Sequence, residues 1–209
     1  MPDAATMDTM TAYDTALDDL AEQIRKLSTR ALTGLFWACS TALLPAAVAW
    51  AEHWGKQPDP ALARGLAAAR QFAATGALPP DPRQLLHSLE ASTPFGESPG
   101  YYSPGNAQDC WICADVSIRV LADPGYDPGP AIQYALEPVM AIATQELFGV
   151  SQVGSGDQEE AQIIAIMRHP RTAEAITFCR WAAGFLHQRP SPAEDDLAAV
   201  VRSAAALTP

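Results

Sequence analysis

Residues 11–30 read TAYDTALDDLAEQIRKLSTR, and apolar side chains recur in them every three or four positions. The acids Asp14, Asp18, Asp19 and Glu22 fall between those apolar positions. This period places the apolar side chains on one face of an α-helix and the acids on the opposite face. The first four residues, Thr-Ala-Tyr-Asp, fit a capping box with Asp in place of Glu. The segment therefore predicts an amphipathic helix that begins at Thr11 and buries its apolar face.

The same helical period continues along most of the chain, interrupted by proline and glycine. Further helices are expected at residues 29–54 (broken or kinked at Pro45), 60–74, 82–89, 106–121, 130–150 (kinked at Pro138), 155–169, 172–187 and 192–204. No segment shows the alternating pattern of a strand. The sequence therefore predicts an all-α fold, a single-domain bundle of about eight or nine helices.

The domain organisation is simple, because 209 residues suit one domain of ordinary size. We expect residues 1–10 to be a flexible amino terminus and residues 11–209 to form a single all-helical domain. Within it, residues 92–105 contain three prolines, three glycines and the aromatic side chains Phe95, Tyr101 and Tyr102. That density of helix breakers predicts a loop, and a loop of this length in a compact domain is often functional.

The charge of the chain restricts its partners. Acids outnumber bases 24 to 13, which gives a formal net charge of −11. Nucleic acids and anionic membranes are bound mainly by Lys and Arg, so neither is expected as a partner. Residues 31–51 are apolar and long enough to cross a bilayer, but their polar side chains favour a buried central helix. Because the first ten residues do not resemble a signal peptide, we expect a cytoplasmic protein with reduced cysteines.

The pair Cys110-Trp-Ile-Cys113 has the spacing of some redox and metal sites. No strand is predicted before it, as a thioredoxin-like unit requires, and no second pair supplies the remaining ligands of a structural zinc site. We therefore expect both cysteines to pack in the core and expect no metal or cofactor. Thiol-dependent metal or redox chemistry at Cys110 and Cys113 is the weaker alternative.

The acidic surface is the remaining functional feature, and it favours binding over catalysis. Complementary charge speeds the encounter with a basic protein, and tyrosines often anchor the centre of an interface. The predicted contact residues are therefore Glu97, Tyr101 and Tyr102 in the loop together with Asp157, Glu159 and Glu160. The alternative is an enzyme or small-molecule-binding protein with an interhelical cavity, lined by Trp50, Trp54 and Trp111 and gated by the 92–105 loop.

Part of the chain resembles a known family. FWACSTALLP at residues 36–45, Trp54-Gly55, and ALARGLAAAR at residues 61–70 follow one another as in the YjaG-like family of small helical bacterial proteins. The sequence departs from that family in lacking an acid directly after Gly55 and in carrying the long Pro/Gly/Tyr loop. The resemblance implies an all-α fold, no assigned catalytic residues, and a role like that of immunity proteins, which neutralise a partner toxin.

Overall fold

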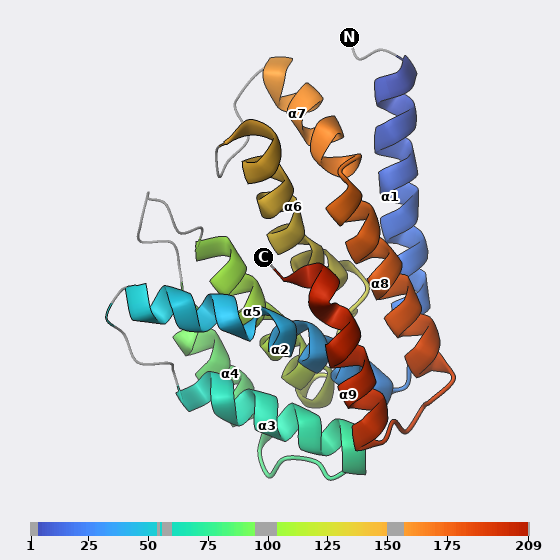
Figure 1. The fold of residues 1–209 in the computed structure, drawn as a ribbon. Helices are drawn as coiled ribbons and strands as arrows, with labels where there is room; N and C mark the ends of the chain where they lie inside the picture. The colour runs from blue at the N-terminus through green and yellow to red at the C-terminus, as the bar shows by residue number, and fades with distance from the viewer. Residues whose placement is uncertain (1–3, 54, 56–59, 95–103, 150–156, 209) are drawn as a thin grey trace.

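Nine α-helices and two short 3₁₀ segments make up the described part of the chain (Figure 1). The computed structural model describes residues 4–53, 55, 60–94, 104–149 and 157–208, and none of these residues is in a strand. The all-α prediction is therefore confirmed. The elements are α1 (Ala4–Arg25), α2 (Thr29–His53), α3 (Pro60–Thr75), α4 (Pro82–Ser92), α5 (Pro104–Ala122), η1 (Pro130–Ile132), α6 (Gln133–Phe148), α7 (Asp157–Met167), α8 (Pro170–His187), α9 (Glu194–Ser203) and η2 (Ala204–Leu207).

Helix α2 is the centre of the molecule. It packs most extensively against α5 and also contacts α3, α8 and α9. Its residues 31–40 are all buried. A helix that is covered on every side carries apolar side chains all round, whereas a surface helix carries them in a single stripe. It is the one described helix that is long and apolar enough to span a membrane, but 67% of its most apolar stretch is buried inside the protein. Helix α2 is thus placed as a core helix.

Of the break or kink predicted at Pro45, the break does not occur, because Pro45 lies inside the continuous helix α2. The helix runs unbroken from Thr29 to His53. Proline removes the hydrogen bond to the carbonyl four residues earlier, here that of Thr41. Pro45 lies on the exposed side of α2, where water can hydrate a carbonyl that has lost its partner. The cost of the proline is therefore small enough for the packed helix to continue.

Helix α1 begins at Ala4, well before the predicted start at Thr11. Residues 4–10, expected to be part of a flexible amino terminus, are therefore helical. Tertiary contact explains the difference, because this end of α1 packs against α7. Thr9 accepts a hydrogen bond from the Arg168 side chain, with Nε at 2.9 Å. A capping signal marks a favourable start, but packing against another helix extends the helix beyond it.

Other helix boundaries differ by a turn or less from those predicted. The Asp81 carboxylate caps α4 by accepting from the Gln84 N–H at 2.9 Å, as the Asp-Pro pattern predicts. The predicted helix 130–150 is a 3₁₀ turn followed by α6, which ends at Gly149 with φ 67°. The loop was predicted at 92–105, but Ser92 still belongs to α4 and α5 begins at Pro104. The rest of that prediction, at residues 95–103, lies outside the described residues.

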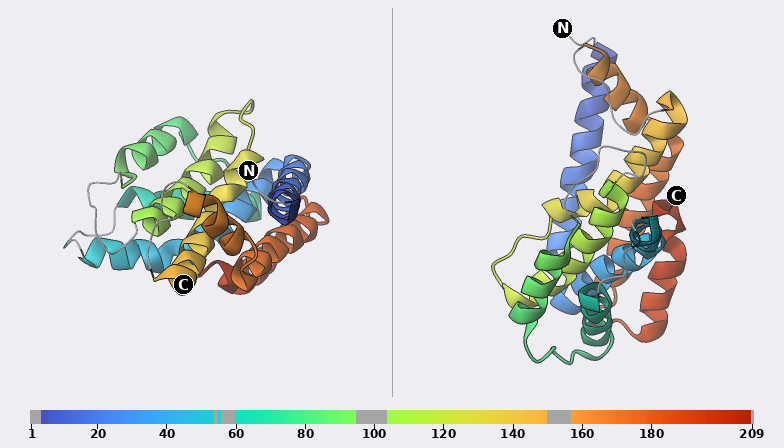
Figure 2. Two further views of the ribbon diagram at one scale, coloured as in Figure 1. Left: turned by 90° about the horizontal axis from the view of Figure 1, so that it is seen from above. Right: turned by 90° about the vertical axis from the view of Figure 1, so that its left-hand side faces the viewer.

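The helices form an elongated molecule. The amino-terminal end of α1 and all of α7 lie side by side at one end, and α3 and α4 lie at the opposite end (Figures 1 and 2). Helices α1 and α8 run along each other between these ends. The end formed by α1 and α7 carries the groove described next.

Candidate functional site

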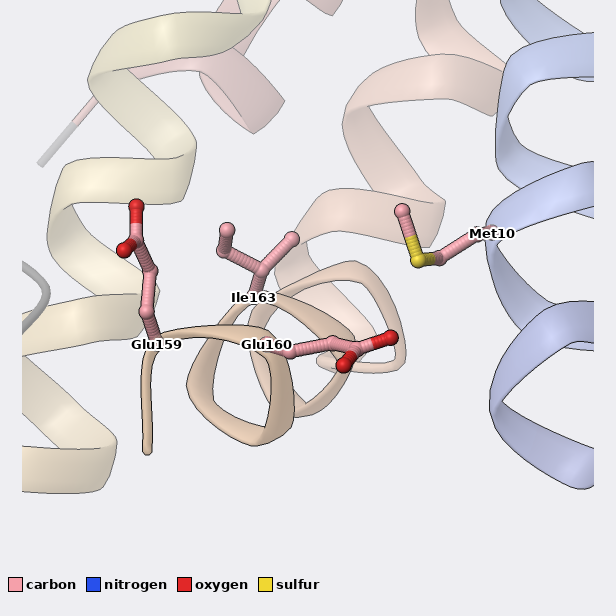
Figure 3. Close-up of a pocket in the computed structure, with 4 residues that line it drawn as sticks. All are labelled: Met10, Glu159, Glu160 and Ile163. Atoms are coloured by element: carbon pink, nitrogen blue, oxygen red, sulfur yellow. The ribbon is translucent and has the colours of Figure 1, made fainter. Parts of the chain in front are cut away.

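An open groove lies between α1 and α7 at the end of the molecule (Figure 3). Met10 from α1 and Glu159, Glu160 and Ile163 from α7 line it, and its volume is about 250 Å³. Ile163 points up between the two glutamates, which extend toward opposite sides of α7, and Met10 faces it from α1. The groove therefore has an apolar floor and an acidic rim.

Helical geometry produces this arrangement from a short sequence. Consecutive residues of an α-helix are 100° apart, so Glu159 and Glu160 diverge. Ile163 follows Glu160 by three positions and Glu159 by four, which puts it on the face between them. Acids near the start of α7 also stabilise the helix through its dipole. The helix dipole therefore explains why acids occur at this end of α7, but it does not explain the apolar side chains between them.

The contact between Arg168 and Thr9 holds the two sides of the groove together. Arg168 follows directly on α7, and Thr9 precedes Met10 in α1, so this bond fixes α1 next to α7. Within the part of the chain that the structure describes, no ion pair joins Glu159 or Glu160 to a basic residue. The two carboxylates are thus available to a cation from outside.

Two of the six predicted contact residues, Glu159 and Glu160, lie in this groove. Asp157 begins α7, but its side chain lies outside the described residues, as do Glu97, Tyr101 and Tyr102 entirely. Sequence reasoning missed Met10 and Ile163. The helical spacing of Ile163 from the two glutamates was a usable signal, whereas Met10 fell in the segment expected to be flexible.

A second acidic feature lies inside the protein, where α5 meets α6. Asp109 is only 3% exposed, and its carboxyl group shares a hydrogen bond with Glu137. Burial and the negative charge of Glu137 raise the pKa of Asp109 to about 8. At neutral pH, Asp109 is therefore protonated and donates to the Glu137 carboxylate. Nearby, the Tyr13 hydroxyl donates to the Met140 sulfur at 3.2 Å.

The cysteines are core residues. Cys39, Cys110, Cys113 and Cys179 are free thiols with no exposed surface. Burial raises the pKa of Cys39 and of Cys110 to about 12 and that of Cys113 and Cys179 well above the usual value. Among the described residues, no three His, Cys, Asp or Glu side chains are grouped as metal ligands. The thiolate that redox or metal chemistry at Cys110 and Cys113 requires is thus strongly disfavoured.

The tryptophans of the alternative hypothesis pack against each other. Trp50 and Trp111 meet edge to face with ring centroids 6.3 Å apart. Trp111 is 2% exposed, and its indole N–H donates to the Ser92 hydroxyl at 3.1 Å. Trp54 lies outside the described residues. Trp111 is therefore a core residue, and the half-buried Trp50 packs against it.

Comparison with known proteins gives a structural relative and no family. No family model matches this chain, and no curated protein matches it significantly. The chain is similar to the crystal structure of a DUF416 family protein from Shewanella baltica, with a TM-score of 0.66 and 14% sequence identity. The match covers 88% of this chain and 92% of that one. At this identity the likeness shows that the two proteins share a fold.

Proposed function

We propose that this protein binds a basic partner protein through the α1–α7 groove. The observation that carries the proposal is the pair of unpaired carboxylates, Glu159 and Glu160, on either side of Ile163 in an open groove. An apolar floor contributes affinity by removing apolar surface from water, and a charged rim selects and orients the partner.

Ion pairs within the protein neutralise part of each of the other acidic clusters. At the start of α9, Glu194 pairs with Arg70 at 2.8 Å and Asp196 with Arg189 at 3.0 Å. On α1, Glu22 pairs with Lys26 at 2.7 Å. These acids are partly neutralised within the protein, whereas Glu159 and Glu160 have no basic partner among the described side chains. The net charge of −11 then strengthens the attraction of a basic protein over a longer range.

The narrowest form of the proposal is an immunity or antitoxin role, in which the partner is a basic toxin domain. The resemblance to the YjaG-like family supports this form, and a cytoplasmic location goes with it. A protein of this kind acts by occupying its partner and needs no catalytic residue of its own.

The test compares two variants that remove the same charge from different helices. Glu159→Gln with Glu160→Gln neutralises the groove, and Asp18→Asn with Asp19→Asn neutralises two exposed acids on α1. Fluorescence anisotropy with a labelled lysine-rich helical peptide measures binding at low salt. We expect the groove variant to bind at least fivefold more weakly than the α1 variant. Equal weakening by both variants, or no binding by the unaltered protein, would overturn the proposal.

A further inference from the structure

The shape of the groove specifies more than the charge of its partner. Glu159 and Glu160 extend toward opposite flanks of α7, and Ile163 lies between them with Met10 facing it (Figure 3). A single cation cannot contact both carboxylates and also cover the apolar side chains between them. The groove is complementary to two cations separated by an apolar group.

Helix geometry gives the separation that such a partner needs. Two extended glutamates on adjacent positions, 100° apart around a helix, hold their carboxylates roughly 10 Å apart. Residues i and i+7 of a helix lie about 10.5 Å apart along its axis and on the same face. A residue at i+3 or i+4 lies between them on that face. One helix of a partner can therefore present cation, apolar side chain and cation in the order that the groove requires.

From this match we infer that the groove takes an amphipathic basic helix with Lys or Arg at positions i and i+7 and an apolar side chain at i+3 or i+4. The inference rests on the proposed function and names the element of the partner that docks. The apolar side chain packs against Ile163 and Met10, while one cation reaches Glu159 and the other Glu160. Their aliphatic stems cover the rest of the floor.

Two alanine-based helical peptides test the inference. The first carries Lys at i and i+7 and Leu at i+4, and the second is identical except for Ser in place of Leu. We expect the first to bind at least tenfold more tightly by fluorescence anisotropy. Ile163→Ser, and independently Met10→Ser, should weaken binding of the Leu peptide to the level of the Ser peptide and leave the Ser peptide unchanged. Circular dichroism melts of both variants show that each remains folded.

The outcomes separate the inference from the proposed function. If both peptides bind equally and both respond to Glu159→Gln with Glu160→Gln, the groove binds basic partners by charge alone and the inference is wrong. If neither peptide binds, or if that double variant changes nothing, the proposed function fails as well. A third peptide, with the two lysines at i and i+1, tests the spacing. Binding as tight as that of the first peptide contradicts the i, i+7 arrangement.

Discussion

Ser40 and Cys110 each donate a hydrogen bond to the backbone carbonyl of the other. The Ser40 hydroxyl donates to the Cys110 carbonyl oxygen at 2.7 Å, and the Cys110 thiol donates to the Ser40 carbonyl oxygen at 3.3 Å. Neither residue is exposed. The two bonds join α2 to α5, the most extensively packed pair of helices, at one fixed register. Cys110 thus has a structural role that accounts for its burial.

All four thiols should be unreactive in the folded protein. Burial keeps each pKa far above neutrality, so the thiolate that attacks a disulfide reagent is almost absent. With Ellman's reagent at pH 8 we expect almost no reaction of the native protein and four thiols after unfolding in guanidinium. A thiol that reacts rapidly in the native state and disappears in Cys110→Ser would instead support thiol chemistry.

The bond from Ser40 should contribute to stability because it joins two helices. Ser40→Ala removes it, and we expect a loss of about 1 kcal/mol in the free energy of unfolding. Ser117→Ala is the matched control, since Ser117 is equally buried but donates to Ala114 within its own helix at 2.6 Å. Urea unfolding of both variants measures the difference. A loss for Ser117→Ala as large as that for Ser40→Ala would show that the interhelical bond has no special weight.

Local sequence was sufficient to predict the helices. Periodic apolar positions identified the fold class, and local spacing also accounts for the Asp81 cap and for the i,i+4 ion pair of Asp115 with Arg119 at 2.9 Å. Whether Pro45 breaks α2 could not be predicted locally, because its effect depends on which side of the helix it faces, and that is a property of the packed molecule.

Features that depend on distant residues could not be predicted in the same way. Met10 and Ile163 both line the groove. Most of the chain separates them in sequence, so no local pattern links them. The helix predicted at residues 106–121 would place Asp109 in its first turn. Its helix instead begins earlier, at Pro104, and its carboxyl meets Glu137 on another helix. Glu159 and Glu160, which were predicted as contact residues, line the groove, and their signal, adjacent acids near a helix start, is itself local.

Stability should depend on pH through Asp109. Its pKa is about 8 in the folded protein and near 3.8 when the chain is unfolded. Between those values the unfolded chain is ionised while the folded protein holds the proton, so this group lowers stability progressively as pH rises from about 4 to about 8.

Asp109→Asn removes that penalty. We expect the melting temperature of the variant minus that of the unaltered protein to grow as the pH rises from 5 to 8. Asp19→Asn, at an exposed position of α1, controls for the loss of one surface carboxylate. If the difference between Asp109→Asn and the unaltered protein is constant across this range, the shared proton is not present.

Two helical glycines should respond differently to replacement by alanine. Nothing lies within 4 Å of a Cβ added at Gly184 in α8, so Gly184→Ala should stabilise the protein by about 0.5–1 kcal/mol through helix propensity. A Cβ at Gly34 in α2 would lie 2.7 Å from Cδ2 of Leu197, which is fully buried in α9. Gly34→Ala should therefore destabilise the protein, because Leu197 must move within a packed core. If thermal unfolding shows that Gly184→Ala and Gly34→Ala increase stability equally, the close contact of α2 with α9 is contradicted.

The most direct test of the binding groove is a methyl NMR titration with the alanine-based peptide that carries Lys at i and i+7 and Leu at i+4. We predict that the methyl resonances of Met10 and Ile163 shift in parallel with saturation, while those of Ile24 and Ile118, which are fully buried in the core, remain in place. Saturable binding that leaves Met10 and Ile163 unshifted, or that moves resonances elsewhere on the surface first, would contradict the assignment of the groove as the binding site.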